Sequence, residues 1–170
     1  GELLPNKNQK MSILAVKNVI RKYPDVLLLF AGNGPEKENL EKMIKENRLE
    51  KHIDFLGYIT NLQEYQQVAD IAISCSKREG LPLNIVEAML SKTPVIASNN
   101  RGHRELICDK KNGFLVDVDD YKEMAKRILF LLDENVVYRE IQSSAEAYAM
   151  DYTFTNVKKE LMKVYELKDE

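Results

Sequence analysis

The strongest constraint on the fold is a repeated alternation between short, wholly apolar runs and longer segments whose apolar residues recur at helical spacing. Residues 7–22 place Met11, Leu14 and Val19 on one helical face, and the apolar run at 26–31 then follows. A strand that is apolar on both sides is buried on both faces, as in a parallel sheet covered by helices. The sequence therefore predicts an α/β domain with a doubly wound parallel sheet and helices on both faces.

The same reading assigns the rest of the chain. We expect helices over 7–22, 35–48, 62–68 and 82–91 and a short one after Gly102, strands at 26–31, 52–56, 70–75, 94–98 and 113–117, and two or three helices at the end. Ligands of such sheets bind beyond the carboxyl ends of the strands. The loops that begin at Gly32, Gly57, Ser76 and Ser98 are therefore the places to search for chemistry.

Composition excludes several classes of protein. The chain has 25 Lys and Arg against 27 Asp and Glu, so it lacks the basic excess that holds a nucleic acid, and we expect no nucleic-acid partner. Its apolar runs are far shorter than the about 20 residues that span a bilayer. Cys75 and Cys108 lie far apart and are interpreted as small buried side chains, which fits a reducing, cytoplasmic setting.

Two acidic residues lie in unusual surroundings. Pro82 suits the first turn of a helix, so Glu79 is expected in the loop before it. Along that helix Asn84, Glu87 and Ser91 form a narrow polar stripe on an otherwise apolar surface. A carboxylate there can accept two hydrogen bonds from a sugar diol, and the amides of 80–84 can seat a phosphate. The alternative is that Glu79 is a solvated loop acid and Glu87 lies on a half-exposed helix face.

The motif "EGLPLNIVEAMLSKTPVIAS" (79–98) resembles the E-x7-E signature of the retaining glycosyltransferases of family 4. The segments "KNQKMSILAV", "PDVLLLFAGNGP" and "IDFLGYITNLQEYQQVADIAISCS" resemble parts of the same family in the same order. "RGHRELICDKKNGFLVDVDD" (101–120) is similar to the branch that builds capsules and exopolysaccharides, and it carries Arg101-Gly102 where the family usually has Gly-Gly.

The resemblance implies the carboxy-terminal, donor-binding half of a GT-B enzyme, with a Rossmann-like sheet in a single domain over 1–170. Its first strand is expected to be truncated near Gly1 to Leu4, and the amino-terminal acceptor domain is expected to be absent. By resemblance, Glu79 is catalytic and lies beside the donor sugar. The implied donor-binding residues are Lys7 for the diphosphate, Glu87 for the ribose, Gly57, Tyr58 and Ile59 for the base, and Gly80, Leu81, Pro82, Leu83 and Asn84 around the diphosphate and sugar.

The implied ligand is a UDP- or GDP-sugar, with no bound metal and no other cofactor. One departure concerns the second cation of the family's diphosphate site, because Glu2 stands where an arginine is common. Neutralisation then rests on Lys7 alone or on Lys77 or Arg78 near the motif.

The functional hypothesis is a retaining transferase of cell-surface polysaccharide assembly, acting on a lipid-linked or saccharide acceptor in the cytoplasm or at the inner face of the plasma membrane. This piece alone is expected to bind donor without turnover. Two alternatives stay open: a non-catalytic nucleotide-binding subunit of a two-chain transferase, and a GT-B sugar-nucleotide epimerase.

Other features favour structural roles. His52 and His103 have no partner at a ligand-like spacing, so a surface or interface position is expected and neither receives a role. Gly32-x-Gly34 is interpreted as a tight turn lining the cleft. The segment "KRILFLL" (126–132) could contact a membrane surface, although a helix packed on the sheet explains it equally well. Its apolar stripe is predicted to be core: Met124, Ala125, Ile128, Leu129 and Leu132.

Overall fold

Helices and strands alternate along the chain as the periodicity predicts. The structure is a computed structural model that describes residues 1–165, so the last five residues of the predicted 1–170 domain lie outside the described part. The elements are η1 Pro5–Lys7, α1 Gln9–Val19, β1 Leu28–Ala31, α2 Lys37–Glu46, β2 Ile53–Gly57, α3 Leu62–Val68, β3 Ala72–Ser74, α4 Leu83–Leu90, β4 Val95–Ser98, α5 Arg101–Leu106, β5 Phe114–Val116, α6 Tyr121–Asp133, α7 Asn135–Ala149, η2 Met150–Tyr152 and α8 Phe154–Val164.

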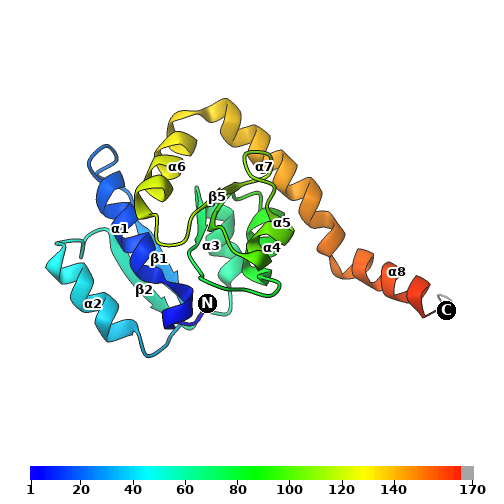
Figure 1. The fold of residues 1–170 in the computed structure, drawn as a ribbon, viewed down its shortest axis with the longest axis horizontal. Coiled ribbons are helices and arrows are strands. Elements are labelled where there is room, and N and C mark those ends of the chain that lie inside the picture. The colour runs from blue at the N-terminus through cyan, green and yellow to red at the C-terminus, as the bar shows by residue number, and fades with distance from the viewer. Residues whose placement is uncertain (166–170) are drawn as a thin grey trace.

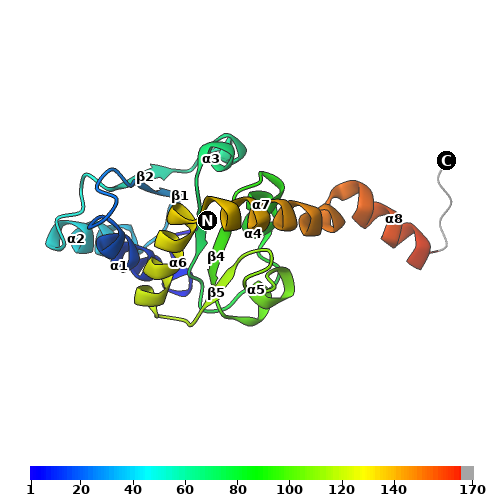
Figure 2. The ribbon, with the colours of Figure 1, turned by 90° about the horizontal axis from the view of Figure 1, so that it is seen from above.

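The strand pairs of these elements are parallel, which confirms the predicted fold class. β1 pairs with β2, and β3, β4 and β5 form a second sheet in that order. The register brings Ile96 of β4 opposite Ile73 of β3 and Phe114 of β5. Parallel neighbours require a crossover between them, and helices supply each one (Figures 1 and 2).

Both faces of the three-stranded sheet are buried, as the apolar strand sequences predict. Ile96 packs into one cluster with residues of α1 and α6, whereas its neighbours Val95 and Ala97 pack into another with α4, α5 and α7. Because successive side chains of a strand point to opposite faces, "PVIAS" must be apolar throughout. The predicted α6 stripe also packs in the first cluster, so the α6 segment lies against the sheet.

The two sheets do not join within the described residues. β1 and β3 face each other across a cleft of about 590 Å³ that is lined by both strands and reached by Gly1. The Gly1 amino group donates to the Ala31 carbonyl at 2.6 Å, at the carboxyl end of β1. Leu29 of β1 remains 39% exposed.

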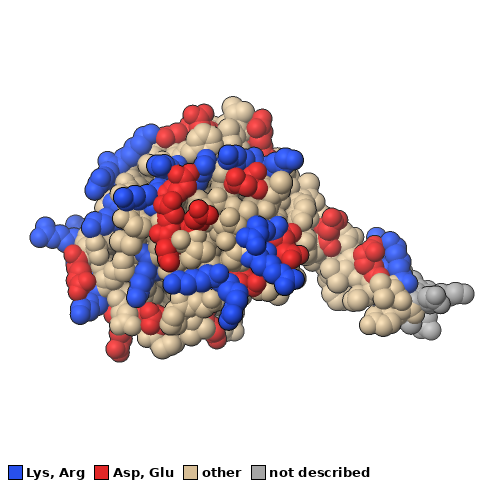
Figure 3. Space-filling view, viewed as in Figure 1, with Lys and Arg blue, Asp and Glu red and all other residues tan. Residues whose placement is uncertain are grey.

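The last helices extend away from the sheets. α7 packs on α4 through Ala145 and Ala149, and α8 continues outward with no buried residue (Figure 1). Over the face drawn in Figure 3, basic and acidic side chains are interspersed. Within residues 1–165, no helix is both long and apolar enough to cross a bilayer.

Several boundaries and one burial prediction were wrong. The short helix α5 begins at Arg101 and so contains Gly102, and β3 is shorter than the predicted 70–75. Cys75 is buried as predicted, but Cys108 is exposed because it lies in the turn between α5 and β5 rather than in a strand.

Candidate functional site

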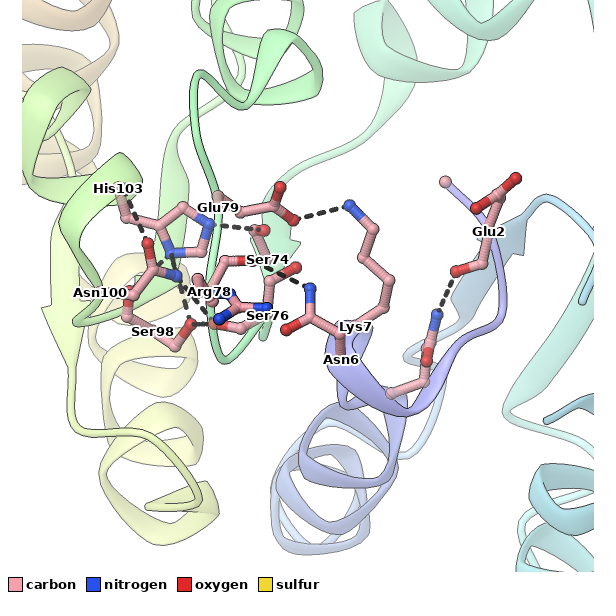
Figure 4. Close-up of polar contacts among 12 residues, drawn as sticks. Glu2, Asn6, Lys7, Ser74, Ser76, Arg78, Glu79, Ser98, Asn100 and His103 are labelled. Atoms are coloured by element: carbon pink, nitrogen blue, oxygen red, sulfur yellow. Dashed lines mark hydrogen bonds and ion pairs between the residues drawn. The ribbon is translucent and has the colours of Figure 1, made fainter.

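Lys7 and Glu79 meet at the carboxyl ends of the strands although 72 residues separate them. Lys7 ends η1, and Glu79 lies in the loop between β3 and α4. The Lys7 Nζ atom lies 2.6 Å from Glu79 Oε1, with the side chains 30% and 15% exposed (Figure 4). The two residues thus form one partly buried ion pair in the free protein.

Two hydrogen bonds hold η1 and the Glu79 loop together. The Asn6 amide side chain donates to the Arg78 carbonyl at 2.9 Å, and the Lys77 amide donates to the Asn6 carbonyl at 2.8 Å. Asn8 adopts a left-handed conformation with φ of 53°, which turns the chain from η1 into α1. The position of Lys7 is therefore set by its own backbone as well as by the ion pair.

The Glu79 carboxyl is stabilised as a carboxylate. Burial acts to raise its pKa, but hydrogen bonds from Lys7 and Ser76 outweigh burial and hold the pKa below its ordinary value. Glu79 is therefore an anion at neutral pH, and its charge is already matched by Lys7. A ligand that binds Lys7 would leave the Glu79 carboxylate free to accept hydrogen bonds from another group.

The helix that follows Glu79 presents free backbone donors. α4 begins at Leu83 after Pro82, one residue later than predicted, and no side chain caps it. Among residues 1–165, the amides of Leu83 and Asn84 have no protein acceptor. Gly80 and Leu81 are exposed before this helix, and Leu83 is exposed as well. Free amides at a helix amino terminus favour an anionic ligand.

Glu87 lies on the narrow polar side of α4, as the periodicity predicts. It is half-buried, whereas Ile85, Val86, Ala88 and Met89 are buried. No hydrogen bond to the Glu87 carboxylate occurs within residues 1–165. Glu87 thus keeps a half-buried carboxylate whose need for hydrogen-bond donors a ligand can meet.

The loop after β2 follows the carboxyl end of its strand, as the Glu79 loop does, but the two loops are not bonded to each other. Gly57 has φ of 66°, which favours glycine, and its carbonyl accepts from the Gly32 amide at 2.7 Å. Tyr58 is 80% exposed and Ile59 is half-buried. Within the described residues, no hydrogen bond or ion pair joins this loop to Glu79 or Glu87.

Of the other candidate cations, Lys77 lies near an acidic residue of its own. Lys77 lies 3.9 Å from Asp119, and both are exposed. The Lys7 side chain points toward Glu79 rather than toward Glu2 (Figure 4). Gly32 and Gly34 both pack directly against the backbone of residues 1–3. Among residues 1–165 no group of three His, Cys, Asp or Glu is arranged to hold a metal ion, and metal independence stays a prediction.

His103 is the residue that the sequence reasoning missed. A surface or interface position was predicted, but the side chain is completely buried behind the Glu79 loop. Its ring bonds to the Ser98 carbonyl at 2.6 Å and lies 3.1 Å from Ser74 Oγ. One signal was available: the helix cap Asn100 lies two residues after the end of a buried strand, so the first turn of α5 faces the end of the sheet. His52 is half-buried in the other sheet region.

A small pocket adjoins the site on the α5 side. Its volume is about 380 Å³, and it is lined by Glu79, Gly80, Leu81, Arg101 and Glu105. Glu79 and the exposed turn that leads into α4 thus border one concave region. The arrangement offers a cation, an anion and several N–H donors to a ligand that carries both phosphate and hydroxyl groups.

Comparisons with known proteins give a consistent result. The family model described as glycosyl transferases group 1 matches residues 1–149. EpsD of Bacillus subtilis (strain 168) is 34% identical over 165 residues, which cover 97% of this chain and 43% of EpsD. The poly(ribitol-phosphate) alpha-N-acetylglucosaminyltransferase of Staphylococcus aureus (strain COL) is 33% identical over 146 residues, covering 85% of this chain and 30% of the relative.

A solved structure agrees with these sequence matches. HepE of Anabaena in complex with UDP-glucose superimposes with a TM-score of 0.87 at 26% identity, covering 98% of this chain and 47% of HepE. The chain thus spans less than half the length of each of these three relatives.

Proposed function

Because the chain belongs to the glycosyl transferases group 1 family, we propose that it is the donor-binding part of a retaining glycosyltransferase. The enzyme would transfer a sugar from a nucleotide diphosphate to a lipid-linked or saccharide acceptor of a bacterial cell-surface polysaccharide. It would work in the cytoplasm at the inner face of the plasma membrane. The similar structure of HepE with UDP-glucose supports a UDP-sugar as the donor.

One observation carries the proposal: Lys7 and Glu79 form a 2.6 Å ion pair beside the uncapped amino terminus of α4. In the free protein each group satisfies the other. A sugar diphosphate presents an anion to Lys7 and hydroxyl groups to Glu79, so it can replace both halves of the pair at once. The site is thereby matched to a ligand in which phosphate and sugar are adjacent.

The remaining residues of the site would bind the other parts of the nucleotide sugar. We assign the diphosphate to Lys7 and to the turn and amides of Gly80, Leu81, Pro82, Leu83 and Asn84. Glu87, half-buried and without a hydrogen bond among residues 1–165, would accept from the ribose hydroxyls. The loop Gly57, Tyr58 and Ile59 would contact the base.

The proposed chemistry is electrostatic. A departing nucleotide diphosphate gains negative charge as the sugar bond breaks, and a lysine plus fixed amides stabilises that charge without reorganising. Glu79, held as a carboxylate by Lys7 and Ser76, would orient the sugar through its hydroxyl groups. These roles belong to binding and orientation, and turnover needs the acceptor-binding part of the enzyme.

The domain organisation is part of the same proposal. The cleft between β1 and β3 would hold a first strand parallel to both, running toward Gly1, whose amino group bonds to Ala31. An acceptor domain would cover the outward apolar side of α8, where Phe154, Val157 and Leu161 are exposed. The coverage of the relatives, 43% for EpsD, supports a longer enzyme.

Calorimetric titration of the purified chain with UDP, GDP and ADP, and then with their glucose conjugates, tests the proposal. We expect UDP to bind and Glu87→Ala to weaken binding by about 1 to 3 kcal/mol, the scale of lost charge-assisted hydrogen bonds. Glu50→Ala is the matched control, because Glu50 is an exposed acid in a turn far along the chain from the site. No binding of any nucleotide, or equal effects of the two substitutions, would refute the site.

A further inference from the structure

His103 is a completely buried, titratable residue that none of the roles above uses. It lies in the first turn of α5 and connects three elements. Its ring contacts the Ser98 carbonyl at 2.6 Å at the end of β4, and its Nε2 lies 3.1 Å from Ser74 Oγ at the end of β3. Its backbone amide donates to the cap residue Asn100 at 3.1 Å. His103 therefore ties α5 to the carboxyl ends of both strands that border the Glu79 loop.

The same turn of α5 supports the backbone of the Glu79 loop. The Ser76 carbonyl accepts from Ser98 Oγ and from the Asn100 side chain, the latter at 2.8 Å. A Cβ atom at Gly102 would lie within 2.6 Å of the Glu79 carbonyl oxygen and closer still to the Gly80 carbonyl oxygen. The loop thus rests directly on the backbone of α5, and His103 anchors that backbone to the sheet.

The hydrogen bonds assign the form of the imidazole. Nδ1 lies 2.6 Å from the Ser98 carbonyl, which can only accept, and 2.9 Å from the Asn100 Nδ2 amide; the shorter contact favours the proton on Nδ1, and Nε2 then accepts from the Ser74 hydroxyl. Burial lowers the pKa of His103, which keeps the ring neutral at neutral pH. The charged groups that act on it are Glu79, from the β3–α4 loop, and Lys7, from η1. Figure 4 shows His103 reaching Ser74, beside which Glu79 extends toward Lys7.

We propose that His103 is a positioning residue for donor-sugar recognition: it fixes the Glu79 loop through Ser74 and the α5 turn, and thereby sets where the Glu79 carboxylate lies. This inference rests on the proposed function for the role of Glu79. His103 makes no hydrogen bond to Lys7, to the α4 amides or to Glu87, so it acts on the nucleotide part of the ligand only through the pair of Glu79 with Lys7. The loss of His103 should therefore weaken recognition of the sugar rather than of the nucleotide.

Two substitutions of His103 distinguish the hydrogen bond made by Nδ1 from the one made by Nε2. His103→Asn places an amide near Nδ1 and keeps a donor for the Ser98 carbonyl, but it loses the contact with Ser74. His103→Gln places an amide near Nε2 and keeps the contact with Ser74. Because Ser74 lies on the strand that leads into the Glu79 loop, we expect the Gln variant to retain the position of Glu79 and the Asn variant to lose it. His52→Asn is the matched control at the only other histidine of the chain.

The readouts are the 13C titration midpoint of the Glu79 carboxyl and the affinities for UDP, UDP-glucose and UDP-N-acetylglucosamine. In His103→Asn we expect the Glu79 midpoint to rise toward the ordinary 4.5. We also expect the affinity for UDP-glucose to fall relative to that for UDP, about as far as in Glu79→Gln, while UDP itself binds no more weakly than to the wild type, because Lys7 is then released from Glu79. A variant that is merely less stable would weaken UDP and UDP-sugar binding alike.

The results of these experiments test the positioning role of His103 separately from the proposed function. An unchanged Glu79 midpoint in His103→Asn, or a loss of UDP binding equal to the loss of UDP-sugar binding, overturns the positioning role. Equal behaviour of the Asn and Gln variants overturns the assignment of the Ser74 bond. If the wild-type chain binds no nucleotide, the proposed function fails, and the Glu79 midpoint alone then decides whether His103 positions the carboxylate.

Discussion

The ion pair between Lys7 and Glu79 leads to a counter-intuitive prediction: Glu79→Gln should tighten the binding of UDP. In the free protein Lys7 is held by Glu79 at 2.6 Å, so a diphosphate must compete for the ammonium group. The substitution removes that competitor and leaves an amide of the same size. UDP lacks the donor sugar that Glu79 would contact, so it loses no contact when the carboxylate disappears.

The magnitude follows from the exposure of the pair. Exposed ion pairs contribute about 0 to 1 kcal/mol, whereas breaking a buried pair costs about 3 to 5 kcal/mol. Lys7 and Glu79 are 30% and 15% exposed, so solvent screens the pair in part. We take about 1 kcal/mol as the free energy needed to separate Lys7 from Glu79. Because about 1.4 kcal/mol corresponds to a tenfold change in affinity, UDP should bind about fivefold tighter to Glu79→Gln than to the wild type.

The assay is calorimetric titration of UDP into wild type, Glu79→Gln, Lys7→Met and the double variant. Lys7→Met should weaken UDP binding, and in its background Glu79→Gln should have a smaller effect because no ammonium remains to be released. The gain should also shrink at high salt, which screens the partly exposed pair. An unchanged or weaker affinity for UDP in Glu79→Gln would show that the pair does not compete with the diphosphate.

Two further predictions concern the support of the site. Gly102→Ala should lower the free energy of unfolding by about 1 to 3 kcal/mol, because its Cβ would overlap the carbonyl groups of Glu79 and Gly80; urea unfolding measures this, and a change below experimental error would disprove the close approach. The folded state disfavours protonated His103, whose pKa is lowered from 6.5, so the wild-type free energy of unfolding should fall as pH drops below 6.5, until the lowered pKa is passed. His103→Asn lacks this group, and identical pH slopes for the two proteins would contradict the neutral, buried imidazole.

Much of the fold could be predicted because it depends on neighbours close in sequence. The apolar strand "PVIAS" signals burial on both faces, and Ile96 and its neighbours Val95 and Ala97 do pack on opposite sides. Pro82 marks the start of α4 to within one residue, since a proline is tolerated at the first turn. The polar side of α4 with Glu87 follows from helical periodicity alone.

Burial of single polar residues could not be predicted in the same way. His103 and Cys108 are five residues apart, yet one is fully buried behind a loop and the other is exposed in a turn. Local pattern does not distinguish them, because what covers His103 comes from β3 and β4 rather than from its own helix. The separation of β1 from β3 likewise depends on which strands find partners in space.

By itself, the sequence determined the order and type of the elements, the parallel α/β class and the candidate residues of the site, because periodicity, turn residues and motif spacing act over a few neighbouring positions. Only the tertiary structure decided that Lys7 pairs with Glu79 across 72 residues and that His103 lies beneath the Glu79 loop. The physical reason is that charges and hydrogen bonds act over a few ångströms, and packing of the strands, not distance along the chain, determines which groups come that close.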